Sequence, residues 1–156
     1  MRLVLLFALL SGCATAKPAL AVPIVDDKWE QMQEVPEGLV SKLASDTTGF
    51  SSRKLSALVT VSTYVKPKSR DVTASGLAHI IHYDIMSNAP ASVTTTEVVK
   101  SRAFKSAYEF TIRAEIGYSR IVVIDVGSRV KVIKSFTDRS TSEAGLNRFV
   151  NSLQVM

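Results

Sequence analysis

Apolar and polar residues alternate along much of the C-terminal half of the chain. In residues 108–116 every second side chain is apolar, and the positions between them carry Glu, Thr or Arg. A period of two with one apolar and one polar side is typical of a half-buried strand in an antiparallel sheet. Gly117 and Gly127 mark short gaps before residues 120–126 and 129–136, where the alternation continues, and we expect hairpins there. The three segments therefore predict a meander.

Three further strands are expected upstream. Residues 54–66 are rich in β-branched side chains and alternate between an apolar and a hydroxyl-bearing side. This favours a strand, although a helical stripe through the same residues leaves a helix open. The Thr-rich residues 93–100 predict another strand. Between them, residues 77–86 predict a strand with these side chains on one side: Leu77, His79, Ile81, Tyr83 and Ile85.

The C-terminus has the pattern of an amphipathic helix. Ser140 and Glu143 have the spacing of a capping box, in which two side chains satisfy the free N–H groups of a helix start. A stripe with helical spacing follows: Leu146, Phe149, Val150 and Leu153. We expect this helix to lie across the sheet.

Shorter helical segments are expected nearer the N-terminus. Residues 37–44 predict a short helix and residues 28–34 a helical turn, and Pro36 separates the two. Together these elements predict the α+β class. The expected sheet is an antiparallel meander of five or six strands with its apolar face covered by the C-terminal helix.

The first residues have the pattern of an export signal. Arg2 precedes an apolar run over residues 3–10, which is too short to span a bilayer. The tetrapeptide that follows, Leu10-Ser11-Gly12-Cys13, resembles a bacterial lipobox. The resemblance implies that a diacylglycerol is attached to the Cys13 sulfur, that residues 1–12 are removed, and that the new N-terminus is acylated.

The lipobox also implies a location. An aspartate after the cysteine retains such lipoproteins at the inner membrane, and Ala14 occupies that place, so the resemblance favours the outer membrane, with the domain facing the periplasm. Two alternatives stay open. Cleavage after Ala21 releases a soluble periplasmic protein, and an unexported chain keeps the apolar run as a buried strand.

The remaining chain is predicted to be a tether and one domain. Residues 13–27 hold two prolines and no amphipathic period, which is typical of an extended linker, and residues 28–156 have the size of a single domain. Hydrophobic residues make up 46% of the chain and charged residues 21%, so a folded core is expected. The single cysteine leaves no intramolecular disulfide, and the core must supply the stability.

Charge is distributed unevenly along the sequence. Residues 26–50 carry six acidic residues against two lysines, whereas residues 51–71 carry five basic residues against one aspartate. A basic face attracts anionic polymers or headgroups at long range, although scattered lysines on a solvated surface give the same count. Nucleic acid is not an expected partner, because the compartment and the motifs both disfavour it. The candidate binding residues are Lys66, Lys68, Arg70, Arg129 and Lys131.

No catalytic or metal-binding motif is present in the sequence. On a strand, His79 and His82 point to opposite faces and do not chelate one metal. No serine lies in a G-x-S-x-G turn. Glu109 and Glu115 are about 20 Å apart on a strand, too far for a glycosidase pair, and they are expected in exposed pairs with Arg113. We therefore expect no enzyme, cofactor or metal.

Two features could serve protein recognition. Trp29, the only tryptophan, either docks the tether onto the sheet or forms an exposed anchor for a partner, since aromatic residues are enriched in binding hot spots. If residues 92–96 form a sheet edge, their free backbone groups can accept a strand from another protein.

Two segments, residues 75–81 and 108–126, resemble small bacterial envelope domains with a TATA-binding-protein-like fold. Such domains place a helix where residues 54–66 are expected as a strand, and the resemblance transfers no functional residues.

Two hypotheses of function follow. The first is a non-enzymatic, lipid-anchored envelope protein that acts as an accessory or assembly factor for a partner protein. The alternative is a module that binds an anionic envelope polymer, peptidoglycan or lipopolysaccharide.

Overall fold

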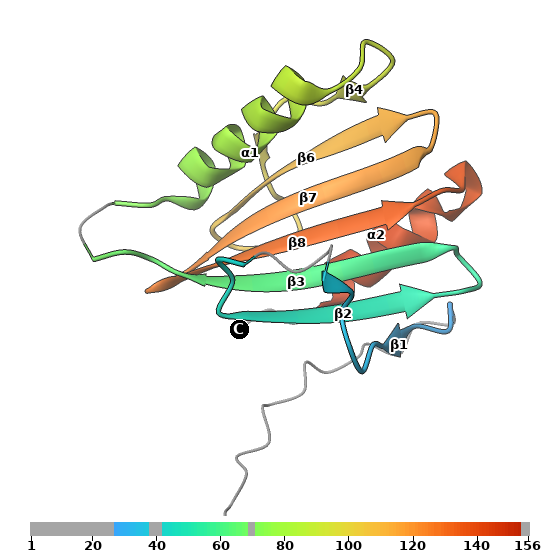
Figure 1. The fold of residues 1–156 in the computed structure, drawn as a ribbon, viewed down its shortest axis with the longest axis horizontal. Helices are drawn as coiled ribbons and strands as arrows, with labels where there is room; N and C mark the ends of the chain where they lie inside the picture. The colour runs from blue at the N-terminus through green and yellow to red at the C-terminus, as the bar shows by residue number, and fades with distance from the viewer. Residues whose placement is uncertain (1–26, 38–41, 69–70, 154–156) are drawn as a thin grey trace, which may run out of the picture.

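The computed structural model describes residues 27–37, 42–68 and 71–153. Within these residues one antiparallel sheet of eight strands forms, in the order β1-β2-β3-β8-β7-β6-β4, with β5 also paired to β6 (Figure 1). The strands are β1 (Glu30–Gln31), β2 (Asp46–Ser52), β3 (Ala57–Val65), β4 (Thr94–Thr95), β5 (Val99–Lys100), β6 (Ala107–Ala114), β7 (Gly117–Val126) and β8 (Arg129–Thr137). The predicted α+β class with an antiparallel sheet is confirmed.

The C-terminal meander is confirmed. β6 pairs with β7 and β7 with β8, and tight turns join them at the two expected glycines. Gly117 has φ +143°, and a Cβ there would lie 2.2 Å from the carbonyl oxygen of Thr137. Glycine is therefore required at this turn, because the backbone of a neighbouring strand occupies the space of a side chain.

The strand expected in residues 54–66 is also confirmed, as β3, and the helical alternative is wrong. β3 pairs along its whole length with β8, more than sixty residues later in the sequence. β2 pairs with β3 on its other side and was not expected, because its sequence DTTGFSS is short and mostly polar.

The strand expected in residues 77–86 is wrong. These residues belong to the helix α1 (Ala74–Asn88). Thr73 caps it, since its hydroxyl accepts the backbone N–H of Gly76 at 3.1 Å. The error has a physical origin: Ile80 and Tyr83 are exposed while Ala78 and Ile81 face the sheet, so apolar residues occur all round this helix and hide its period.

The C-terminal helix is confirmed as α2 (Glu143–Ser152), preceded by a 3₁₀ turn, η2 (Ser140–Ser142). The expected capping box is wrong. Ser140 lies in the 3₁₀ turn, and the residue that caps α2, Ser142, makes no side-chain capping hydrogen bond.

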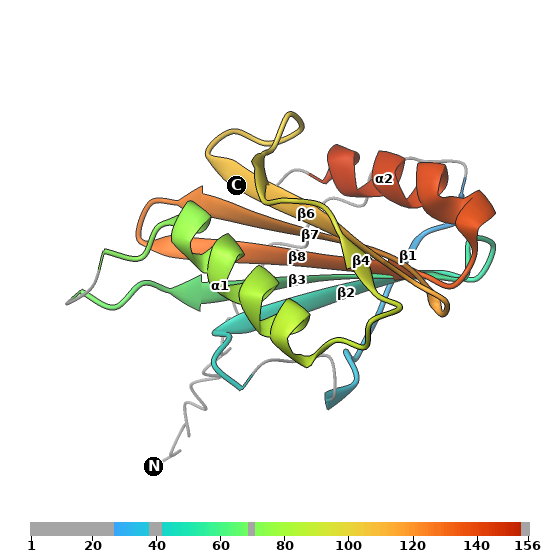
Figure 2. The same ribbon diagram turned by 90° about the horizontal axis from the view of Figure 1, so that it is seen from above.

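Helices cover both faces of the sheet, and each closes its own core. Figure 2 shows α1 and α2 on opposite sides of the strands. Phe149 and Val150 of α2 pack on residues such as Val59 and Ile133, whereas α1 packs on Phe110 and its neighbours. The expectation that the polar side of these strands faces solvent is thus wrong. The apolar face of β6 is covered by α1, and the opposite face is partly covered by α2.

The helical turn expected in residues 28–34 is wrong, because β1 lies there. The helix expected in residues 37–44 includes residues 38–41, which lie outside the described residues, and residues 42–43 form a turn. The expected Thr-rich strand is divided into the two short strands β4 and β5, and β4 ends the sheet order, so its place at an edge is confirmed.

Candidate functional site

The structure brings the predicted basic residues together at one end of the sheet. Val65 of β3 pairs with Arg129 of β8, and the backbone N–H of Lys66 donates to the Ser128 carbonyl at 3.0 Å. The turn after β3 therefore lies beside the β7–β8 hairpin. We call Lys66, Lys68, Arg129 and Lys131 the basic end. The fifth predicted residue, Arg70, lies outside the described residues.

Acidic neighbours offset part of the charge at the basic end. The Lys66 ammonium donates to both carboxylate oxygens of Asp125, at 2.8 and 2.7 Å. Burial lowers the pKa of Lys131, and Arg129 lowers it further, while Asp46 acts in the opposite direction. Lys68 and Arg129 are exposed. The net positive charge here is smaller than the sequence alone suggests.

Trp29 is a core residue. Only 7% of it is exposed, and its ring stacks on Phe149 of α2 with a centroid distance of 3.8 Å and an interplanar angle of 12°. Its indole N–H has no hydrogen-bond partner within the described residues. The docking alternative fits this geometry, and the exposed anchor is wrong because the ring lies beneath α2.

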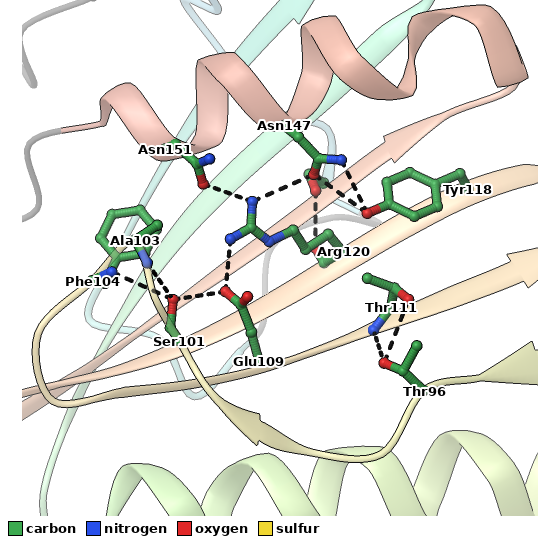
Figure 3. Close-up of polar contacts among 11 residues, drawn as sticks. Thr96, Ser101, Ala103, Phe104, Glu109, Thr111, Tyr118, Arg120, Asn147 and Asn151 are labelled. Atoms are coloured by element: carbon green, nitrogen blue, oxygen red, sulfur yellow. Dashed lines mark hydrogen bonds and ion pairs between the residues drawn. The ribbon is translucent and has the colours of Figure 1, made fainter.

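A buried arginine, which sequence reasoning missed, organises a polar cluster under α2 (Figure 3). The Arg120 side chain is 8% exposed, and its Nη2 donates to Glu109 Oε2 at 2.7 Å. Its Nη1 donates to Asn151 Oδ1 at 2.7 Å and to Asn147 Oδ1 at 3.4 Å. The same Glu109 oxygen accepts the Ser101 hydroxyl at 2.7 Å. We call these residues the arginine cluster.

The cluster borders an open cleft of about 480 Å³ to which Arg102 and Thr111 also contribute. The guanidinium hydrogen bonds of Arg120 join α2 to β6, and the paired groups satisfy one another. This pattern is that of a clamp between a helix and a sheet rather than of a nucleophile beside a general base.

The expected pairing of Glu109 with Arg113 is wrong. Glu109 and Arg120 are diagonal neighbours on β6 and β7, so they meet beneath α2. Arg113 instead forms an ion pair with Glu143 at the start of α2 and lies over the ring of Tyr118. The one sequence signal for the burial of Arg120 was its place on the same side of β7 as Val122 and Ile124.

The two histidines lie on α1, so their expected placement on opposite faces of a strand is wrong. His79 Nδ1 lies 2.9 Å from the Ser75 carbonyl oxygen, and His82 Nε2 lies 2.9 Å from the Thr95 hydroxyl. The His82 ring also meets the Phe110 ring edge-on. In the described part of the chain, no three His, Cys, Asp or Glu side chains gather as a metal site.

The outer side of α1 exposes two large apolar side chains among polar ones. Ile80 is 66% exposed and Tyr83 is 74% exposed, and their spacing of three residues places them on one side of the helix. We call this pair the outer face of α1. The exposed residues of α2 differ, being Ala144, Arg148 and Asn151.

The lipobox and Cys13 lie outside the described residues. Among the residues that the structure describes, no helix has the length and apolar character needed to cross a membrane.

Comparison with known proteins identifies the fold. No protein-family model matches the sequence, and no curated protein matches it. The chain is similar to the solution structure of cyanobacterial PsbP (CyanoP) from Synechocystis sp. PCC 6803, with a TM-score of 0.50, 12% identity and coverage of 82% of each chain. The fold is therefore PsbP-like. The resemblance to TATA-binding-protein-like domains stays a prediction.

Proposed function

We propose that this protein is a lipid-anchored envelope protein that acts without catalysis as an accessory or assembly factor. In this proposal it holds a partner protein at the periplasmic side of the outer membrane through the outer face of α1. The observation that carries the proposal is the exposure of Ile80 and Tyr83 on a helix whose opposite side already covers the sheet.

The contrast between the two covering helices supports an interface at α1. Each helix buries one apolar side, but only α1 presents an isoleucine and a tyrosine, both about two-thirds exposed or more, to solvent. Tyrosine is enriched among the residues that carry most of the binding energy at protein interfaces.

The N-terminal sequence supports the anchor and the location. Three acyl chains on Cys13 would hold the domain at a membrane far more firmly than one chain, which binds only marginally. The linker of residues 13–27 would separate the domain from the bilayer surface.

Site-specific photocrosslinking in membranes tests the interface. A photoreactive residue at Tyr83 is expected to give a discrete crosslinked species, and the same residue at Ala144 on α2 serves as the control. Adding Ile80→Lys to the Tyr83 probe should abolish the species. The proposal fails if both helices give the same species, or if the Ile80→Lys change leaves it intact.

The basic end supports the second candidate, binding of an anionic envelope polymer. Its residues come from distant parts of the sequence and gather at one place, with Lys68 and Arg129 exposed. Binding to purified peptidoglycan or lipopolysaccharide should then weaken steeply with salt and with Lys68→Gln plus Arg129→Gln. Arg53→Gln, an exposed site elsewhere, should have no effect, and salt-independent binding would exclude this candidate.

A further inference from the structure

Three neighbouring hollows lie on the face of the sheet that α1 partly covers. The first holds about 300 Å³, the middle one about 210 Å³ and the last about 300 Å³. The first and middle hollows share Lys134, and the middle and last hollows share Phe136. On the helix side, Leu77 and Ile81 line the first hollow and Ile85 lines the last. We call this row of three hollows the α1 groove.

The groove exists because α1 covers only part of its face of the sheet. The helix packs on β6 and β7, and the same face of β8 and β3 lies beside it. The first hollow is the most apolar, with Val72, Leu77 and Ile81 from the helix side and Val130 and Val132 from β8.

Lys134 is the exposed cation in the wall of the groove. It is placed on β8 between Thr60 of β3 and Ile121 of β7. Within the described residues its ammonium makes no hydrogen bond or ion pair, whereas the Lys66 ammonium at the far end of the first hollow is held by Asp125.

We propose that the α1 groove binds a single-chain fatty acid, with the acyl tail in the first hollow and the carboxylate on the ammonium of Lys134. Small-molecule sites are mostly apolar, with a few polar groups that fix orientation, and this groove has that character. The first hollow holds about 300 Å³, and the one available ammonium matches one carboxylate. The inference does not rest on the proposed function, because the outer face of α1 is not part of the groove.

Calorimetric titration of the purified protein with dodecanoate tests the proposal. One site per chain is expected, and octanoate should bind more weakly because its shorter tail buries fewer methylene groups. Dodecyltrimethylammonium has the same tail and the opposite charge, so it should bind at least tenfold more weakly than dodecanoate.

Two variants separate the contribution of the Lys134 ammonium from nonspecific hydrophobic binding. Lys134→Met keeps an apolar stem and removes the ammonium, and it should weaken dodecanoate binding at least tenfold. Lys105→Met, at an exposed position away from the groove, is the matched control and should bind as the unmodified protein does. Circular dichroism confirms that both variants are folded. The proposal is overturned if dodecanoate does not bind, if the cationic amphiphile binds equally well, or if Lys134→Met binds dodecanoate as tightly as Lys105→Met.

Discussion

Replacement of Phe149 by alanine removes the ring at the centre of the core beneath α2. Phe149 is fully buried, stacks on Trp29 and meets the edge of Phe50 at a centroid distance of 5.4 Å. Truncation of a buried phenylalanine costs about 3–5 kcal/mol, from lost transfer free energy and the cavity left behind. A domain of this size has a total stability of about 5–15 kcal/mol, so Phe149→Ala should stay folded with a much smaller margin.

Urea denaturation gives the measurement, and the protein provides its own probe. Trp29 is the only tryptophan, so its fluorescence reports on this core, and circular dichroism reports on the whole domain. The urea concentration at the midpoint of unfolding should fall, while the slope of the free energy of unfolding against urea concentration should stay unchanged. The folded-state emission of Trp29 should shift, because its stacking partner is lost. Ile116→Ala, at a position 76% exposed, should change the free energy of unfolding by no more than about 0.5 kcal/mol. A cost below about 1 kcal/mol for Phe149→Ala, or an unchanged Trp29 emission, would refute the assignment of this core.

Three further predictions concern stability. Arg120→Met leaves the Glu109 carboxylate under α2 without its guanidinium, so denaturation should show a loss of about 3 kcal/mol, partly recovered by adding Glu109→Gln. Lys131→Met should raise the free energy of unfolding at neutral pH, because the folded state lowers the pKa of this lysine and so disfavours its charged form. In denaturation at several pH values, the extra stability of Lys131→Met should fade as the pH rises from the lowered pKa towards the pKa of an unfolded lysine. A Cβ at Gly117 would meet the backbone, whereas a Cβ at Gly127 would meet nothing within 4 Å. Gly117→Ala should therefore lower the melting temperature more than Gly127→Ala. Equal melting temperatures of the two variants would contradict this.

The strands that alternate strongly and end in glycine turns could be predicted from the sequence. β6, β7 and β8 were found this way because their side-chain pattern and their turns agree. β2 was missed because register with β3, rather than its own composition, makes it a strand. The turn that joins β2 to β3, residues 53–56, holds no glycine or proline to mark a hairpin.

The error at α1 has the same origin as the surface that carries the proposed function. Tyr83 on the outer side adds an apolar residue between Ile81 and Ile85, and the result reads as the alternation of a strand. The capping threonine, Thr73, was the available signal for a helix start. A residue pattern that contradicts its own secondary structure is expected where function requires exposed apolar side chains.

The candidate sites divide along similar lines. Charge counts named the residues of the basic end, but their gathering depends on the β3–β8 register, and the Lys66–Asp125 pair depends on the β7–β8 hairpin. The arginine cluster and the α1 groove arise from contacts between elements. Neither leaves a motif in the sequence.

The mass of the mature protein, purified from its native membrane, tests the central claim most directly. We expect an N-terminus at Cys13 that carries a diacylglyceryl group on sulfur and an acyl group on nitrogen. An unmodified Cys13 thiol, or a chain that begins at any other residue, would contradict the anchor and the envelope role that depends on it.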